Sequence, residues 1–224
     1  PTQVMLGLVG AALLPRPRSA CVVGLGTGTS AGWLADVSGM ERVDVVEIEP
    51  AIRDLAGDAF APVNRDVLRK ANVRVVLGDA REMLLVRGPA YDVVASEPSN
   101  PFRPGVASLY TREFYQSVRA RLSPDGIFCQ WLQGYQVDKT SVGLVCATLS
   151  SVFPYVEIWV TKPGDLLFVC HQDAPTYSVA HLRQRLAEPP FAEALRRAWL
   201  TESVEGFLAR HYAGPALARS LAAG

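Results

Sequence analysis

The chain has 224 residues, of which 49% are hydrophobic, so it is long enough for one sizeable core with an appendage. Lysine plus arginine equals aspartate plus glutamate, at 22 each. Because no net charge attracts the chain to polyanions, the composition argues against nucleic acid or an anionic membrane surface as a partner.

The cysteines are far apart in the sequence and form no C-x-x-C pair; they are Cys21, Cys129, Cys146 and Cys170. We expect buried free thiols in a reducing compartment, which favours a cytoplasmic location. The three histidines are also dispersed. Their spacing suits no metal, and we predict no metal site.

The apolar run nearest the N-terminus, Val4 to Leu14, is shorter than the roughly 20 residues that span a bilayer. It also lacks a signal-peptide cleavage pattern. We therefore predict a packed helix here and no membrane segment in this chain. Since the chain begins at Pro1 and ends in small residues, we expect it to be a piece of a longer polypeptide.

Short apolar runs alternate with helical stretches from residue 20 to about residue 134. The predicted strands are 19–25, 42–49, 73–79, 91–97 and 126–132. The predicted helices between them are 30–38, 50–60, 80–87 and 111–122, the last with Thr111 as its N-cap. Four of the strands are almost continuously hydrophobic, which is typical of a parallel sheet covered by helices on both faces.

The pattern changes after a further helix predicted at 139–153. Two β-rich runs within 155–170, joined across residues 162–165, indicate an antiparallel hairpin. We predict an α/β, Rossmann-like class I AdoMet-dependent transferase fold, with a mostly parallel seven-stranded sheet and a C-terminal antiparallel hairpin. Residues 1–174 form the expected catalytic domain, and 175–224 form a helical appendage interrupted at Pro189 and Pro190.

A glycine-rich turn follows the first predicted strand, at Gly24, Gly26 and Gly28, with Thr27 inside it. Glycines there let the backbone approach a ligand and leave amide groups facing it at a helix N-terminus. The dinucleotide fingerprint needs a glycine where Thr29 stands. The remaining G-x-G-x-G pattern indicates an adenosyl-sulfonium ligand, although a purely structural tight turn is the alternative.

Acidic residues also stand at the ends of the next two predicted strands. Glu47 and Glu49, with Ile48 between them, come about 20 residues after the glycines, where an acid can bind ribose hydroxyls. Asp79, followed by Ala80, is suited to bind an adenine amino group. One of the two glutamates could simply be solvated, and Asp79 could also serve as a helix N-cap.

The fourth strand opens into the loop of "YDVVASEPSNPF", whose first charged residue is Glu97. Parallel strands bring their carboxyl ends to one edge of the sheet, where ligands of open α/β sheets bind. The acids of three successive strands together with the glycine turn therefore predict an adenosyl ligand. A carboxylate that caps backbone amides near Ser99 and Asn100 is the alternative for Glu97.

The order and spacing of five blocks resemble the spermidine synthase family of aminopropyltransferases, over about residues 20 to 133. The blocks are "VVGLGTGTSAG", "VVEIEPAI", "VVLGDAREML", "YDVVASEPSNP" and "LYTREFYQSVRARLSPDGIFCQW". The later hairpin and arginine-rich tail look like a bacterial branch in which such a domain is often fused to transmembrane helices. The chain could then be the cytoplasmic domain of a membrane-anchored protein.

The resemblance implies decarboxylated AdoMet as co-substrate and an amine as acceptor. It places Glu47 at the ribose, and Asp79 with Ala80 at the adenine. Thr27 stands where the family has an aspartate that binds the aminopropyl ammonium. Family members commonly dimerise, so a homodimer is possible.

The resemblance also assigns two positions in the loop after the fourth strand. Glu97 stands where the family has its catalytic base, and Asn100 where a second aspartate binds the polyamine. Because a buried ammonium needs a carboxylate partner, neutral Thr27 and Asn100 predict weak binding of multiply charged polyamines. Neutral Thr27 also makes ordinary AdoMet admissible, because the family's aspartate there would repel the AdoMet carboxylate.

Three hypotheses follow. The first is an aminopropyltransferase-like enzyme with Glu97 as base and an acceptor other than the ordinary one, so that spermidine synthesis itself is doubtful. The second is an AdoMet-dependent methyltransferase that acts on an amine or another nucleophile. The third is an adenosyl-ligand-binding domain without catalysis, within a larger protein.

Overall fold

The computed structural model describes residues 1–99, 101–135 and 137–222. Within these residues the chain forms one eight-stranded sheet, in the order β3-β2-β1-β4-β5-β7-β6-β8. The strands are β1 (Ser19–Val23), β2 (Arg42–Glu47), β3 (Val73–Leu77), β4 (Tyr91–Ser96), β5 (Leu122–Gln133), β6 (Tyr155–Lys162), β7 (Asp165–His171) and β8 (His211–Ala213).

Strands β1 to β5 are parallel, and β7 runs antiparallel between β5 and β6. The predicted parallel sheet and C-terminal hairpin are therefore confirmed. The sheet is one strand wider than predicted because the short strand β8 pairs with the outer edge of β6.

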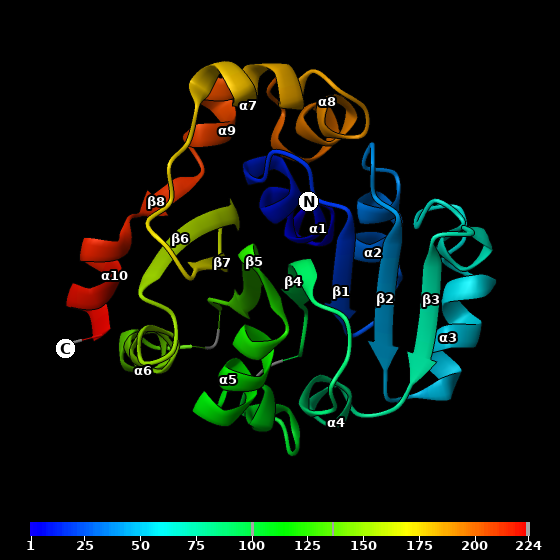
Figure 1. Ribbon diagram of the computed structural model, residues 1–224, viewed down its shortest axis with the longest axis horizontal. Helices are drawn as coiled ribbons and strands as arrows, with labels where there is room; N and C mark the ends of the chain where they lie inside the picture. Colours follow the sequence, from blue (N-terminus) through cyan, green and yellow to red (C-terminus); the bar gives the residue numbers. More distant parts are fainter. Residues whose placement is uncertain (100, 136, 223–224) are drawn as a thin grey trace.

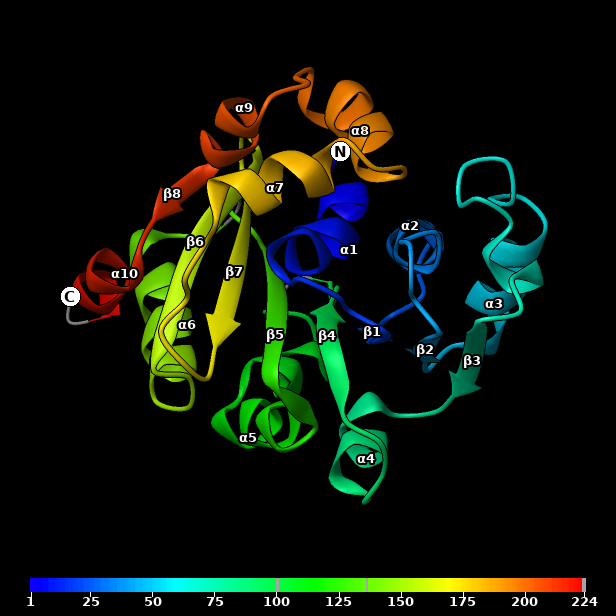
Figure 2. The same cartoon turned by 45° about the horizontal axis from the view of Figure 1, so that its top comes forward.

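Helices cover both faces of the sheet, as Figures 1 and 2 show. The α-helices are α1 (Thr2–Leu13), α2 (Thr29–Ala35), α3 (Pro50–Gly57), α4 (Ala80–Leu85), α5 (Arg112–Ala120), α6 (Lys139–Ser150), α7 (Val179–Leu186), α8 (Phe191–Ala194), α9 (Val204–Leu208) and α10 (Pro215–Ala222). The shorter turns are η1 (Val67–Arg69), η2 (Val106–Tyr110) and the π-helical η3 (Leu195–Trp199). Thr111 caps α5 as predicted, with its hydroxyl accepting from the amide of Phe114.

The strand residues alternate between two buried clusters, one on each face of the sheet. Val93 and Ala95 of β4 pack on the side of α1, α2 and α7. Val94 packs on the side of α4, α5 and α6. Such alternation requires an apolar residue at nearly every position, which explains the continuous hydrophobic runs of the central strands.

Helix α1 lies in the interior of the first of these layers. Its residues Leu6, Leu8 and Val9 are each 0% exposed, and it packs against α2 and the sheet. This agrees with the packed helix predicted from the sequence. Among the described residues, no helix combines the length and the apolar character needed to cross a membrane.

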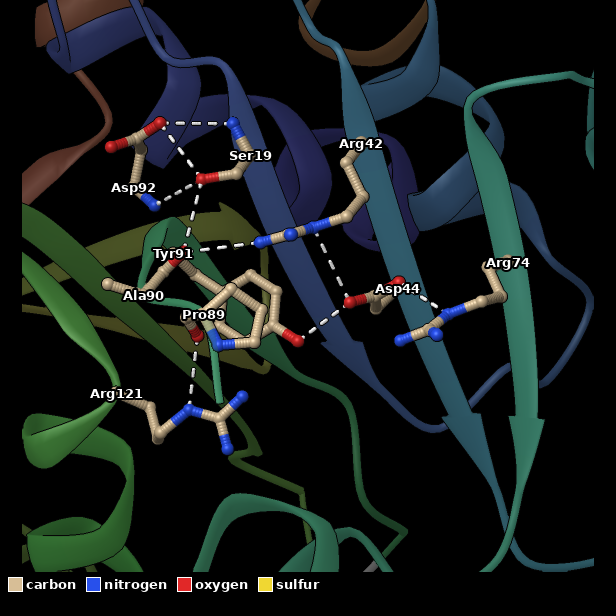
Figure 3. A network of polar contacts seen from close by, with 9 residues as sticks. All are labelled: Ser19, Arg42, Asp44, Arg74, Pro89, Ala90, Tyr91, Asp92 and Arg121. Carbon is tan, nitrogen blue, oxygen red and sulfur yellow. Dashed lines mark hydrogen bonds and ion pairs between the residues drawn. The ribbon is translucent and has the colours of Figure 1, made fainter. Parts of the chain in front are cut away.

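A buried polar network ties the strands together near their amino ends (Figure 3). The carboxylate of Asp44 on β2 is fully buried and accepts hydrogen bonds from Arg74, at 3.0 Å, and from the Tyr91 hydroxyl, at 2.7 Å. Arg121 donates to the carbonyls of Met83 and Val86 at the end of α4. These contacts satisfy buried charges and helix-end carbonyls and explain why such residues lie inside.

The segment after β7 is more than a helical appendage. Its strand β8 extends the sheet, and its side chains Leu182, Phe191, Trp199 and Phe207 join the same buried cluster as α1. The prediction of helices alone was incomplete because a three-residue edge strand has no periodicity that sequence analysis can detect. The residues at the predicted break, Pro189 and Pro190, lie between α7 and α8.

Candidate functional site

The glycine turn connects β1 to α2 with left-handed backbone at all three glycines. The φ angles are +91° at Gly24, +52° at Gly26 and +82° at Gly28. A side chain at Gly24 would place its Cβ 3.2 Å from the carbonyl oxygen of Glu97. Glycine is therefore required by both backbone conformation and the close passage of the β4 loop.

Glu47 closes this turn from the end of β2. The residue is 7% exposed, and its carboxylate accepts from the amide of Leu25, at 2.9 Å, and from that of Glu49, at 2.9 Å. A carboxylate has about four acceptor positions, so Glu47 retains capacity for ribose hydroxyls. Glu49, in contrast, is exposed and caps α3 through the amide of Ala51, the solvated role anticipated for one of the pair.

Asp79 serves as the N-cap of α4 and also faces the same edge. It accepts from the amide of Arg81 at 2.8 Å, and its carboxylate pairs with the Arg81 guanidinium. The Arg81 side chain holds the pKa of Asp79 below its ordinary value, although partial burial opposes this. The N-cap alternative is therefore real, and it leaves Asp79 ionised as a hydrogen-bond acceptor.

Glu97 lies where β4 ends, with its carboxylate mostly buried against α1 and α2. Gln3 Nε2 donates to one carboxylate oxygen at 2.6 Å, and the Ser30 hydroxyl donates to the other at 2.7 Å. Burial raises the pKa of Glu97 above its ordinary value, and the two hydrogen bonds offset this only in part. Among the described residues, the Glu97 carboxylate accepts from neutral donors and has no cation in hydrogen-bonding or ion-pair contact.

Gln3 and Ser30 are site residues that the sequence analysis missed. Gln3 joins two predicted positions, because its amide nitrogen binds Glu97 and its amide oxygen accepts from the Thr27 hydroxyl at 3.0 Å. The Ser30 hydroxyl oxygen also lies 2.9 Å from the backbone carbonyl oxygen of Gln3, so its single proton is shared between that carbonyl and the Glu97 carboxylate. Gln3 is separated from Glu97 by 94 residues and lies one residue before the apolar run from Val4 to Leu14 that was predicted as a packed helix, so no local signal drew attention to it.

A cavity of about 510 Å³ opens at the carboxyl ends of β1, β2, β3 and β4. Figure 1 shows β1, β2 and β3 pointing toward this edge together. Seven predicted site residues line the cavity: Gly24, Gly26, Glu47, Ile48, Asp79, Ala80 and Glu97. The loop that ends in η2 supplies the opposite wall, with Val106, Ser108 and Leu109.

Three other predicted residues do not appear in that lining. Thr27 is turned toward Gln3, and Gly28 faces the interior, where an added Cβ would be 2.7 Å from Val67 Cγ1. Asn100 lies outside the described residues.

The chemistry of the lining fits an adenosyl group. Ile48 is 72% exposed at the mouth and offers an apolar surface for a planar base, while Glu47 and Asp79 offer acceptors. Volumes of about 300–1,000 Å³ are usual for small-molecule sites. Within the described residues, histidine, cysteine and acidic side chains form no cluster suited to a metal.

The strand order 3-2-1-4-5 followed by an antiparallel hairpin, with a glycine turn and strand-end acids, defines a Rossmann-like fold of the methyltransferase type. More narrowly, the chain belongs to the spermine/spermidine synthase family: the model of the spermine/spermidine synthase domain matches residues 2–163. The resemblance found in the sequence is thereby confirmed.

Similar proteins agree with this assignment. A polyamine aminopropyltransferase from Nitrosomonas europaea is 31% identical over 145 residues, which cover 63% of this chain and 44% of that enzyme. One from Mycobacterium tuberculosis is 34% identical over 125 residues, covering 54% of this chain and 24% of that enzyme. The chain therefore spans less than half the length of these two relatives.

Solved structures show the same fold. A spermidine synthase in complex with the transition-state analogue AdoDATO aligns with a TM-score of 0.78 and 18% identity, covering 99% of this chain and 75% of that one. Human methyltransferase-like protein 13 in complex with SAH aligns with a TM-score of 0.68 and 22% identity, covering 83% of this chain and 92% of that one. At these identities the likeness shows the fold alone.

Proposed function

We propose that this chain is a transferase that moves the aminopropyl group of decarboxylated AdoMet to an amine, with Glu97 as the base. The observation that carries the proposal is the environment of Glu97: a largely buried carboxylate with a raised pKa, held by two neutral donors beside a cavity of about 510 Å³. Family membership supports the reaction type.

In the proposed reaction the amine nitrogen attacks the aminopropyl carbon bonded to the sulfonium. A carbon–nitrogen bond forms, the carbon–sulfur bond breaks, and its electron pair neutralises the sulfur to give methylthioadenosine. Glu97 accepts the proton that the nitrogen loses. A base with a pKa raised by burial is better matched to an ammonium than an exposed carboxylate is.

The remaining residues of the site would bind and orient the co-substrate. Glu47 receives the ribose hydroxyls, Ile48 covers the base, and Asp79 with Ala80 receives the adenine edge. The glycine turn approaches the sulfonium end, as its position beside the Glu97 carbonyl supports. Gln3 and Ser30 fix the orientation of the Glu97 carboxylate.

The acceptor is proposed to be less cationic than a polyamine. The proposed role of Asn100 is to contact the acceptor with a neutral amide. A monoamine should therefore be used at least about ten-fold more efficiently than a diamine of the same length, since each unpaired ammonium is costly to desolvate.

Methyl transfer from AdoMet is the second candidate. Neutral Thr27 is the specific observation in its favour, because it does not repel the carboxylate that distinguishes AdoMet from its decarboxylated form. Glu97 would then orient or deprotonate the methyl acceptor.

One experiment separates these functions. The protein is incubated with AdoMet or decarboxylated AdoMet and a mixture of amines, and the nucleoside product is identified by mass spectrometry. Methylthioadenosine formation supports aminopropyl transfer, and S-adenosylhomocysteine supports methyl transfer. Ligand binding by calorimetry without either product indicates a binding domain and contradicts the proposal.

The role of Glu97 is tested in whichever reaction appears. Glu97→Gln keeps the size of the side chain and should lower kcat at least about 100-fold, as loss of a general base does. Glu113→Gln, an exposed glutamate on α5, is the matched control and should retain full activity. Full activity of Glu97→Gln would show that Glu97 is not the base.

The proposed compartment is the cytoplasm, whether for a free enzyme or for a domain of a membrane-anchored protein. The four cysteines, all free and buried, support a reducing environment. Homodimer formation stays a prediction that light scattering coupled to size-exclusion chromatography measures.

A further inference from the structure

A second cavity, of about 540 Å³, lies at the opposite edge of the sheet from the candidate active site. Its walls are the segment 15–18 that leads into β1, the turn 38–41 that leads into β2, and one side of α7. Figure 1 shows α7 and α8 beyond the amino ends of these strands. The volume is in the range of small-molecule sites, about 300–1,000 Å³.

The central group of this cavity is the guanidinium of Arg185 on α7. The side chain is 6% exposed, lies over the ring of Phe191 at 4.9 Å, and pairs through Nη1 with Glu188 at 3.1 Å. Its Nε and Nη2 are buried and have no hydrogen-bond partner among the described residues. One edge of a buried cation thus retains two unused donors, which proteins rarely leave without a partner.

Other residues that line the cavity also supply hydrogen-bond donors or positive charge. His181, one turn before Arg185 on α7, has a buried Nε2 that also lacks a partner within the described part of the chain. Arg16 lines the cavity as well, whereas Arg18 is engaged by Glu41 at 3.0 Å. The lining holds three arginines against two glutamates, so one positive charge is in excess before His181 is counted.

We propose that this cavity is a second ligand site, which binds the oxyanion of a small phosphorylated or carboxylated metabolite through the unpaired Nε and Nη2 of Arg185, after a rotation of the side chain brings these buried atoms to the cavity surface. The Nε and Nη2 donors of a guanidinium form a planar fork that matches two oxygens of a phosphate or carboxylate. Arg16 and His181 contribute further donors, and the volume leaves room for the rest of the molecule. The site is independent of the proposed reaction, since no residue lines both cavities.

Calorimetric titration of the 224-residue protein tests the site, with inorganic phosphate in one arm and citrate in the other. Sodium chloride keeps the ionic strength constant. Saturable binding of at least one probe is expected, and the arm that binds distinguishes a phosphate ligand from a carboxylate ligand. Absence of saturable binding in both arms overturns the proposal.

The variant Arg185→Gln removes the fork and should weaken binding about ten-fold or more. Arg183→Gln is the matched control, because Arg183 lies on the same helix with its side chain 66% exposed and outside the cavity lining. Equal affinity of Arg185→Gln and the unmodified protein contradicts the assignment.

Circular dichroism shows whether Arg185→Gln is folded. If it is not, a second variant still tests the site. Arg16→Gln alters an exposed residue and should fold, yet weaken binding about three-fold or more through the lost charge. If Arg185→Gln is misfolded and Arg16→Gln binds as tightly as the unmodified protein, the proposal is also wrong.

Discussion

At the scale of single residues, the properties of Glu97 depend on side chains far from it in sequence. The donors to its carboxylate come from Gln3 on α1 and Ser30 on α2, which are 94 and 67 residues away along the chain. Hydrogen bonds to a carboxylate favour its ionised form, while burial disfavours it. The pKa of Glu97 is raised because burial outweighs both bonds.

Ser30→Ala should therefore raise the pKa of Glu97 further. Since a base acts in its ionised form, the acidic limb of the pH profile of kcat/KM should move to higher pH, with little change on the alkaline side. The measurement is kcat/KM against pH in the reaction identified above. Ser117→Ala, whose hydroxyl bonds only to the Glu113 carbonyl on α5, should leave the profile unchanged. An unmoved acidic limb in Ser30→Ala would mean that Glu97 does not govern it.

At the scale of elements, the turn between β1 and α2 must satisfy both backbone conformation and packing. Gly28 and Gly39 share a φ of +82°, so a side chain is equally strained at either position. They differ in surroundings: a Cβ at Gly28 would be 2.7 Å from Val67 Cγ1, whereas one at Gly39 would meet nothing within 4 Å. Alanine substitutions at these two glycines therefore distinguish the cost of a strained backbone from the cost of close packing.

Gly39→Ala should lower the free energy of unfolding by about 1–2 kcal/mol through left-handed backbone alone. Gly28→Ala should lose a further 1–3 kcal/mol, roughly, because Val67 and its neighbours must move. Urea denaturation of both variants gives the difference. An equal decrease in the free energy of unfolding for both variants would show that the residues around Gly28 move without cost and that packing there is not a constraint.

The C-terminal hairpin has its own buried carboxylate, Glu157 on β6. It accepts from the Tyr177 hydroxyl at 2.9 Å and from Trp159 Nε1 at 3.2 Å, with His171 3.9 Å and His211 3.7 Å away. Burial opposes ionisation, but His171 and Tyr177 outweigh it and hold the pKa of Glu157 below its ordinary value. Ionised Glu157 thus joins β6, β7, β8 and the chain after β7.

Glu157→Gln should lower the free energy of unfolding at pH 7 by about 1–3 kcal/mol. A carboxyl with a lowered pKa in the folded state stabilises above its unfolded pKa, and that stabilisation is lost as pH falls through the folded pKa. The difference in the free energy of unfolding between the unmodified protein and Glu157→Gln should therefore become smaller below about pH 4. Urea denaturation at several pH values measures it, with exposed Glu202→Gln as control. A gap that is constant with pH would exclude an ionised Glu157.

At the scale of the whole molecule, the segments on either side of residue 174, the predicted boundary between domain and appendage, pack against each other. Phe207 of α9 lies against Trp159 of β6 with ring centroids 5.1 Å apart, and Trp199 Nε1 donates to the Thr161 carbonyl at 2.8 Å. Helices α7 and α8 and the turn η3 pack against α1. Removal of the tail would expose an apolar helix and the outer strands together.

The fragment 1–174 should consequently fail to fold to a stable monomer, since each large buried side chain that loses its partner costs roughly 1.5–3 kcal/mol. Circular dichroism and thermal unfolding test this. Phe207→Ala in the full chain is the milder comparison and should cost about 3–5 kcal/mol. A cooperative, stable 1–174 fragment would establish the tail as an independent appendage.

Much of this molecule was predictable from local signals. The continuous apolar runs of β1, β2, β4 and β5 indicated a covered parallel sheet, and Lys162 to Asp165 indicated the hairpin. Glu47, Asp79 and Glu97 were found because parallel strands bring their carboxyl ends to one edge. Each of these features is encoded by neighbouring residues, so one sequence suffices to detect it.

Other features depend on contacts between distant segments. Gln3 holds Glu97 through α1, β8 pairs with β6 after a long excursion of the chain, and Arg185 meets the segment before β1 in a second cavity. The sequence by itself determined the succession of strands and helices along the chain, the candidate ligand edge and the family. Only the tertiary structure decided how the Glu97 carboxylate is held, which predicted residues face the cavity and how the tail closes the core. Hydrogen bonding and burial depend on packing among residues that no local pattern relates.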